Sequence, residues 1–155
     1  MQTVLISPAS SLNGEIHLPG DKSISHRYAI LGAMSRGTTH ISNYAYNLDC
    51  QSTLRCLEML GVRVAQSSSE VEIESTGWET FRKPSGVLNA GNSGTTLRLV
   101  SALLSASPFV SSIQGDSSLN RRPMQRIITP LEAMGARLKT SHGQCAPLCI
   151  TGNRL

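Results

Sequence analysis

One stretch of this chain occurs twice, and the repeat constrains the fold more than any other feature of the sequence. The first copy, Gly20-Asp21-Lys22-Ser23-Ile24-Ser25-His26-Arg27, aligns with Gly91-Asn92-Ser93-Gly94-Thr95-Thr96-Leu97-Arg98. Further along, the pattern Leu-Glu-x-x-Gly-x-Arg starts at Leu57 and again at Leu131. Repeats that keep their order in this way are copies of one supersecondary unit. The sequence therefore predicts two such units in succession.

Each copy is predicted to run strand, helix, strand, helix, strand, strand. In the first copy, strands are expected over 15–18, 38–42, 62–65 and 71–74, with helices starting near 24 and near 50. Ile24, Tyr28 and Leu31 share one face of the first helix, which Gly37 is expected to end. The stripe Cys50, Leu54 and Leu57 marks the second helix, which should stop at Gly61.

The second copy repeats these elements. They are expected as a strand at 87–88, a helix over about 95–106, a strand at 109–113, a helix over 123–134 and two final strands. Pro123 suits the first position of a helix and Gly135 its end.

The predicted fold is a mixed α/β (α+β) arrangement of repeated βαβαββ units, of which about two are present. The boundaries are an N-terminal strand at 1–14, a first unit at 15–76, a linker up to residue 85 and a second unit at 86–155. Two such units leave sheet edges and helix faces for a third unit or another chain to cover. The sequence therefore resembles an incomplete domain.

Composition limits the possible classes of protein. The chain has 155 residues, 39% hydrophobic and 15% charged, as expected for one folded domain or part of one. An export signal and a run of about 20 apolar residues are both missing, which favours a cytoplasmic protein without a membrane span. The cysteines are expected to be reduced, and Cys145 and Cys149, with only His142 nearby, do not complete a metal site. A net charge of +4 suits an anionic partner of either kind, nucleic acid or a small phosphorylated molecule.

Both copies contain a candidate anion site. In each, a glycine follows the first strand and a short polar run opens the helix, whose free N–H groups attract anions. Lys22, Ser23 and Arg27 add donors and charge in the first copy, whereas the second offers Asn92 and the backbone of Gly94. The structural alternatives are that Asp21 or Ser23 only caps a helix and that Gly94 only permits a turn. Neither run matches a nucleotide-binding glycine motif.

Three further positions are ambiguous from local sequence. Arg121-Arg122-Pro123 precedes the last predicted helix, where a guanidinium group either binds an anion or remains solvated. Asp49 either caps the helix near Cys50 or holds a cationic side chain, and capping is favoured. His26 is expected to be a packing or hydrogen-bonding residue and not a catalyst.

The chain resembles the 5-enolpyruvylshikimate-3-phosphate synthases along essentially its whole length. The resemblance rests on three motifs, Leu18-Pro19-Gly20-Asp21-Lys22-Ser23-Ile24-Ser25-His26-Arg27, Asn89-Ala90-Gly91-Asn92-Ser93-Gly94-Thr95-Thr96-Leu97-Arg98 and Arg122-Pro123-Met124. Members of that family have two domains of three βαβαββ units each. The chain therefore resembles the N-terminal part of such an enzyme.

The resemblance implies transfer of the enolpyruvyl group from phosphoenolpyruvate to shikimate 3-phosphate, with no metal or organic cofactor. It places Lys22, Ser23 and Arg27 at shikimate 3-phosphate. It places Lys22, as the catalytic cation, with Gly94 and Arg122 at phosphoenolpyruvate, a site that glyphosate also occupies. Asp49, Asn92 and Thr95 match positions that line the cleft.

The resemblance also implies a missing partner, because most acid–base groups of the family belong to the second domain. The remaining C-terminal part would come from the same gene product or a companion chain, and the chain alone is expected to be inactive.

Two alternative functions are weaker. The enolpyruvyl transferases acting on UDP-N-acetylglucosamine carry Ala-Lys-Asn where this chain has Asp21-Lys22-Ser23, and a loop cysteine that residues 114–121 lack. A nucleic-acid-binding module would stack bases on aromatic side chains, which make up only 4% of this chain. Neither nucleic acid nor membrane is therefore an expected partner.

Overall fold

The computed structural model describes residues 3–153, which form helices and two sheets. One sheet is antiparallel and the other is mixed. In chain order the elements are α1 (Lys22–Met34), β1 (Arg36–Ile41), α2 (Leu48–Met59), β2 (Arg63–Ser67), β3 (Glu70–Thr76), η1 (Trp78–Thr80), β4 (Leu88–Asn89), α3 (Gly94–Ser105), β5 (Val110–Gln114), η2 (Leu119–Arg121), α4 (Gln125–Ala133), β6 (Arg137–His142) and β7 (Cys145–Thr151). From β4 onward they follow the predicted order strand, helix, strand, helix, strand, strand.

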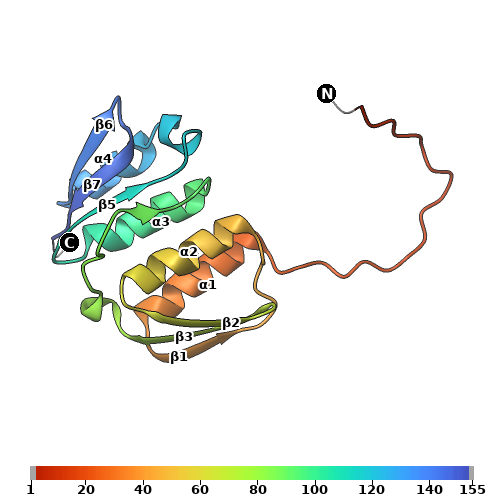
Figure 1. Cartoon of the computed structure of the whole chain (residues 1–155), viewed down its shortest axis with the longest axis horizontal. Coiled ribbons are helices and arrows are strands. Elements are labelled where there is room, and N and C mark those ends of the chain that lie inside the picture. The colour runs from red at the N-terminus through yellow and green to blue at the C-terminus, as the bar shows by residue number, and fades with distance from the viewer. Residues whose placement is uncertain (1–2, 154–155) are drawn as a thin grey trace.

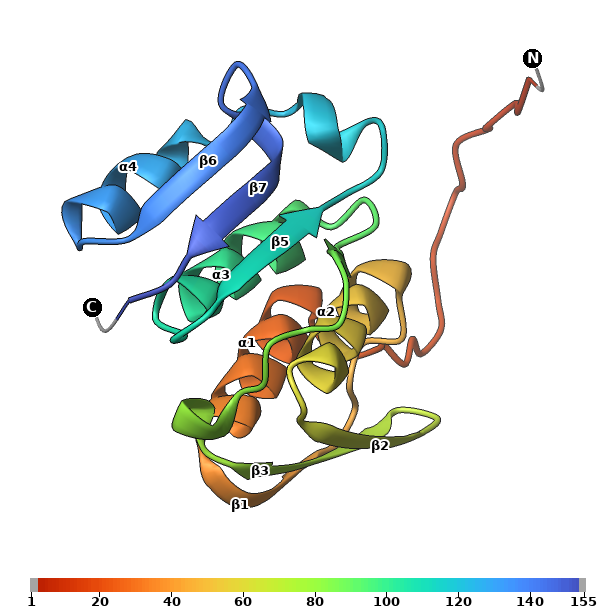
Figure 2. The ribbon, with the colours of Figure 1, turned by 60° about the vertical axis from the view of Figure 1, so that its left-hand side comes forward.

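Helices α1, α2 and α3 lie between two sheets, as Figure 1 shows. One sheet has the order β1-β3-β2 and is covered by α1 and α2. The other has the order β4-β5-β7-β6 and is covered by α3 and α4. Helix α3 also packs on α1 and α2, so the two halves meet through their helices (Figure 2).

The buried positions follow the periods that the sequence shows. Alternate residues of β3, Val71, Ile73 and Ser75, are buried, as expected for a strand with one face on a core. In α2 the predicted stripe of Cys50, Leu54 and Leu57 is buried. The apolar side chains among them belong to one hydrophobic cluster that extends across both halves of the molecule.

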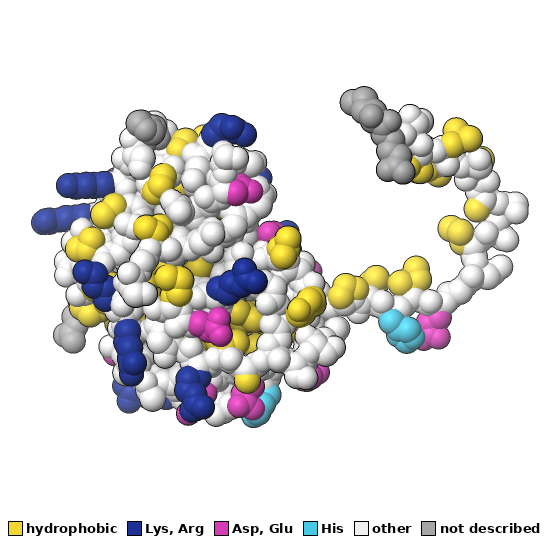
Figure 3. Space-filling model, viewed as in Figure 1, with side chains coloured by type: hydrophobic (Ala, Val, Ile, Leu, Met, Phe, Trp, Pro, Cys, Tyr) yellow, Lys and Arg dark blue, Asp and Glu magenta, His cyan; other side chains and the backbone are white. Residues whose placement is uncertain are grey.

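The first predicted stretch of strand is not formed. Residues 15–18, and residues 3–14 of the predicted N-terminal strand, have no regular structure, while residues 1–2 lie outside the described range. Figure 3 shows this segment running away from the body, and Ile16 and Leu18 are 80% and 76% exposed. A strand is stabilised by hydrogen bonds to a neighbouring strand, and among residues 3–153 no strand pairs with this segment.

The predicted apolar stripe of α1 does not face the core. Ile24, Tyr28 and Leu31 are 52%, 55% and 61% exposed. The buried face consists of small and polar residues with one isoleucine, namely Ser25, His26, Ala29, Ile30, Gly32 and Ala33. Small side chains allow α1 to approach its neighbours closely, which explains why this face and not the larger stripe lies inward.

Two predicted helix boundaries are also wrong. Helix α1 ends at Met34, because Ser35 is extended, and Gly37 lies within β1. Helix α4 begins at Gln125, so Pro123 is not its first residue. Pro123 instead forms a bridge to Cys145, and the Met124 N–H donates to the Gln144 carbonyl, which keeps this segment extended. The predicted ends at Gly61 and Gly135 are confirmed by φ angles of 92° and 102°.

Within residues 3–153, no helix has the length and apolar character that crossing a lipid bilayer requires.

Candidate anion-binding site

Three helices begin at the same end of the molecule. The hydroxyl Oγ1 of Thr96, in the first turn of α3, donates to the carbonyl oxygen of Asp49, in the first turn of α2, over 3.1 Å. The Cys50 thiol contacts the carbonyl oxygen of Lys22, the first residue of α1, at 3.6 Å. Helix N-termini carry free N–H groups and partial positive charge. The positive ends of three helix dipoles therefore lie close together here.

Lys22 and Asp49 form an ion pair across α1 and α2. The distance between Lys22 Nζ and Asp49 Oδ2 is 3.0 Å, and the two side chains are 53% and 30% exposed. Asp49 is not the cap of α2, contrary to the favoured interpretation, because Asn47 Oδ1 accepts from the Cys50 N–H instead. Asp49 therefore holds the ammonium group of Lys22 at the helix ends.

Ser23 and Arg27 lie one turn apart on α1 and are exposed. Within residues 3–153 their side chains make neither hydrogen bonds nor ion pairs. The cap of α1 is Asp21, whose Oδ1 accepts from the Ile24 N–H at 2.7 Å. The capping alternative therefore applies to Asp21 and not to Ser23, and the donors of Ser23 and Arg27 remain available for a ligand.

The start of α3 presents a second group of donors. Ser93 caps the helix by accepting from the Thr96 N–H at 3.1 Å. For the N–H groups of Gly94 and Thr95, the described residues provide no acceptor. The left-handed backbone here belongs to Gly91, with φ 59°, and not to Gly94. Gly94 is consequently not required for a turn, and a Cβ there would meet Arg98 Nη1 at 2.8 Å.

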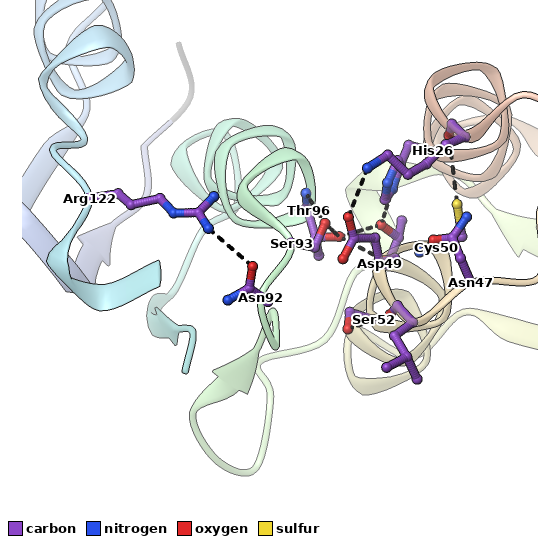
Figure 4. Close-up of polar contacts among 12 residues, drawn as sticks. His26, Asn47, Asp49, Cys50, Ser52, Asn92, Ser93, Thr96 and Arg122 are labelled. Atoms are coloured by element: carbon purple, nitrogen blue, oxygen red, sulfur yellow. Dashed lines mark hydrogen bonds and ion pairs between the residues drawn. The ribbon is translucent and has the colours of Figure 1, made fainter. Parts of the chain in front are cut away.

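Arg122 reaches the start of α3 through Asn92, to whose Oδ1 its Nη2 donates at 3.1 Å (Figure 4). Asn92 Nδ2 in turn donates to Asp116 Oδ2 at 2.7 Å. Asp116 Oδ1 accepts from the N–H groups of Ser118 and Leu119. The Leu119 N–H and then the Asn92 amide hold the pKa of Asp116 below its ordinary value.

Asp116 is a site residue that the sequence analysis missed. Its position after β5, in Gly115-Asp116-Ser117-Ser118, has the composition of a turn in which an aspartate caps the following N–H groups. That signal predicts the local turn but not the contact with Asn92. The predicted location of Arg122 also needs correction, because it follows η2 and is separated from α4 by Pro123 and Met124.

The predicted site residues therefore fall into two linked groups. Lys22 and Asp49 are joined to Thr96, and Asn92 and Arg122 are joined to Asp116. Asn92 and Ser93 are consecutive, which places both groups at the start of α3. Thr95 is half-buried there, and Ser23 and Arg27 lie on the exposed side of α1.

The four thiols differ in their burial in the described part of the chain. All four cysteines are free, Cys50 and Cys56 are buried, and burial raises the pKa of Cys56 to about 12. Among residues whose side chains are described, no three histidine, cysteine or acidic side chains gather as metal ligands. The His142 side chain lies outside that set.

Comparison with known proteins identifies the family. The model of the EPSP synthase family (3-phosphoshikimate 1-carboxyvinyltransferase) matches residues 6–155. This chain belongs to the EPSP synthase family. A 3-phosphoshikimate 1-carboxyvinyltransferase from Solibacter usitatus is 47% identical over 150 residues, which cover 97% of this chain and 35% of that protein. One from Bacillus subtilis is 44% identical over 146 residues, covering 94% and 34%.

The fold agrees with this assignment. A solved EPSP synthase from Acinetobacter baumannii superposes with a TM-score of 0.85 at 41% identity, covering 90% of this chain and 32% of that structure. The chain thus spans about a third of the length of the relatives that it matches. The family contains transferases of the shikimate route to aromatic amino acids, so the chain is part of an enzyme fold.

Proposed function

We propose that this chain supplies substrate-binding residues of a 3-phosphoshikimate 1-carboxyvinyltransferase. The reaction joins the enolpyruvyl group of phosphoenolpyruvate to the 5-hydroxyl of shikimate 3-phosphate and releases phosphate. The observation that carries this proposal is the convergence of three helix N-termini, with Lys22 and Arg122 beside the free N–H groups of α3. Both substrates are phosphorylated anions, the kind of ligand that such an end attracts.

Shikimate 3-phosphate is assigned to the α1 side of the site. Lys22, Ser23 and Arg27 lie within the first two turns of α1, and the donors of Ser23 and Arg27 are free of other described partners. A guanidinium group binds phosphate through two parallel hydrogen bonds, and a hydroxyl adds a third donor. This arrangement supports a phosphate position at the exposed start of α1.

Phosphoenolpyruvate is assigned to the α3 side. Gly94 offers a backbone N–H and no side chain, Arg122 is held beside it through Asn92, and Lys22 reaches the same end of the helices. When the hydroxyl attacks phosphoenolpyruvate, charge develops on a tetrahedral intermediate that retains both a carboxylate and a phosphate. Fixed cations and N–H groups stabilise such charge without having to reorganise.

The proton-transfer groups are assigned to another part of the enzyme. The methylene carbon of phosphoenolpyruvate must gain a proton and the attacking hydroxyl must lose one, which requires positioned acids and bases. In the described site Asp49 is paired with Lys22, Asp116 is bound by N–H groups, and Asp21 accepts from the Ile24 N–H as the cap of α1. We therefore propose that residues 1–14, 15–76 and 86–155 form an incomplete N-terminal domain, completed by a C-terminal part of the same product or a companion chain.

A first experiment tests this division. Phosphate release from phosphoenolpyruvate and shikimate 3-phosphate is measured with the 155-residue chain alone and with the remaining part added. The chain alone should show no turnover, and activity should appear with the added part. Turnover by the chain alone, free of longer enzyme by mass spectrometry, would show that the acid–base groups are misassigned.

A second experiment tests the site. In the assembled synthase, Lys22→Met should weaken phosphoenolpyruvate binding, measured calorimetrically with shikimate 3-phosphate present. A lost charge-assisted contact costs about 1.5–3 kcal/mol, or about one to two decades in affinity. Lys83→Met is the matched control, because the neighbouring Arg82 N–H binds the Leu60 carbonyl at the opposite end of α2. Equal affinity in both variants would remove Lys22 from the site.

A further inference from the structure

A completely buried histidine connects the three helices whose N-termini form the site. His26 is 0% exposed, and its Nδ1 lies 2.7 Å from Thr53 Oγ1 on α2. Thr53 Oγ1 lies 2.7 Å from Thr96 Oγ1 on α3. Thr96 Oγ1 in turn contacts the Asp49 carbonyl oxygen and Ser93 Oγ, at 3.1 and 2.7 Å. A continuous polar chain therefore crosses from α1 through α2 to α3.

The last acceptor of this chain determines which group donates and which accepts in each of its hydrogen bonds. A hydroxyl has one proton, and the Asp49 carbonyl oxygen can only accept. Thr96 therefore donates its proton at that end and must accept from Thr53. Thr53 has then used its own proton, so it accepts from His26, whose Nδ1 must carry a hydrogen. If Thr96 donates to Ser93 instead, the same direction holds between His26, Thr53 and Thr96.

The other ring nitrogen agrees with this assignment. His26 Nε2 is buried and has no hydrogen-bond partner within residues 3–153. A second proton on Nε2 would create a charged ring with an unsatisfied buried donor, which is costly. Burial lowers the pKa of His26, as do Lys22 and Arg27, and the Asp49 carboxylate acts in the opposite direction. These contacts favour a neutral ring with its single proton on Nδ1.

The two contacts at the Thr96 end of the polar chain are to residues that hold the site. Ser93 caps α3 by accepting from the Thr96 N–H, and the N–H groups of Gly94 and Thr95 remain without an acceptor among the described residues. The Asp49 backbone accepts from Thr96 while its carboxylate holds Lys22. Any shift of α3 relative to α2 would therefore change the distance between Lys22 and the start of α3.

We propose that His26 and Thr53 are positioning residues, which fix the start of α3 relative to Lys22 through a hydroxyl chain with His26 in the neutral Nδ1–H form. Neither residue touches substrate in this arrangement. The proposal rests on the proposed function only in that the positioned groups bind phosphoenolpyruvate. The protonation state of His26 is independent of what the enzyme does.

The protonation state is tested by nitrogen NMR of the 155-residue chain labelled in its histidine rings. At pH 7, His26 Nδ1 should resonate as a protonated imidazole nitrogen and Nε2 as an unprotonated one. Thr53→Val keeps the shape of the side chain but removes the acceptor, and should shift the His26 signals. An Nε2–H tautomer or a charged ring in the wild-type chain would overturn the proposal.

The positioning role is tested in the assembled synthase. Thr53→Val should raise the KM for phosphoenolpyruvate by about threefold to tenfold, the range for one net hydrogen bond. Thr53→Ser, which keeps the hydroxyl group, should have the wild-type KM. Ser101→Ala is the matched control, because this buried hydroxyl on α3 bonds only to the Leu97 carbonyl of its own helix. A wild-type KM in Thr53→Val would overturn positioning, provided that Lys22→Met loses affinity. If Lys22→Met also binds normally, the proposed function fails instead. If Thr53→Val does not fold, Thr53→Ala replaces it, and a KM equal to that of Ser101→Ala would overturn positioning.

Discussion

The cap of α3 offers the sharpest test of how this site is built. Ser93 Oγ is buried and has two partners, the Thr96 N–H at 3.1 Å and Thr96 Oγ1 at 2.7 Å. Ser93→Ala removes both contacts. Loss of an N-cap costs about 1 kcal/mol, and loss of a buried hydroxyl contact costs about 1 kcal/mol more. We therefore expect the free energy of unfolding to fall by about 2 kcal/mol.

The assay is urea unfolding of the 155-residue chain, followed by circular dichroism. For a chain of this size, a loss of about 2 kcal/mol corresponds to a fall in Tm of about 4–8 °C. The slope of unfolding free energy against urea should not change, because the substitution alters stability and not the surface exposed on unfolding.

Two other variants make the result interpretable. Asp21→Ala removes the cap of α1, which is exposed, and should cost about 1 kcal/mol or less. Ser101→Ala removes a buried hydroxyl whose acceptor, the Leu97 carbonyl, is also within reach of the helix backbone, and should cost least. If Ser93→Ala costs no more than Asp21→Ala, the buried contacts of Ser93 do not hold α3, and the reasoning fails.

The remaining predictions concern pH and sterics. Because the pKa of Asp116 is lowered, its contribution to stability is present above the ordinary pKa of an aspartate and is lost as pH falls through the lowered value. Asp116→Asn should flatten acid unfolding curves in that range and weaken phosphoenolpyruvate binding by releasing Asn92. The pKa of His26 lies below its ordinary value of 6.5, so stability should fall as pH drops below about 6.5, and His26→Gln should reduce that slope. Gly94→Ala should raise the inhibition constant of glyphosate by a larger factor than the KM for phosphoenolpyruvate, because the added methyl displaces Arg98 and crowds the longer anion. Equal factors in a variant with a normal Tm would contradict this steric argument.

The second unit could be predicted almost entirely from the sequence, because its signals are periodic and local. Strand β5 and helix α3 fall within about one residue of their expected positions. Gly135 ends α4 in the left-handed conformation that favours glycine. Where the chain departs from expectation, at Pro123, a tertiary contact with the β6–β7 hairpin decides the backbone. The sequence around Pro123 does not indicate that contact.

The first unit shows the limit of reading apolar stripes. In α2, Cys50, Leu54 and Leu57 point inward as predicted, whereas in α1 the equivalent stripe of Ile24 and Tyr28 points outward. Periodicity identifies a helix, but it does not say which face meets the rest of the chain when one face is large and apolar and the other small. Packing of α1 against both α2 and a sheet selects the small face.

Asp49 shows why the site itself was harder to predict than the fold. Whether a residue caps a helix depends on its position to within one or two residues. Asn47 is the cap of α2, so Asp49 lies inside the first turn of the helix. There the carboxylate still interacts favourably with the helix N-terminus, but it is directed towards Lys22 on a neighbouring helix. The local sequence around each residue makes it a candidate site residue. Their pairing requires α1 and α2 to begin at the same end, which only the packing of the three helices establishes.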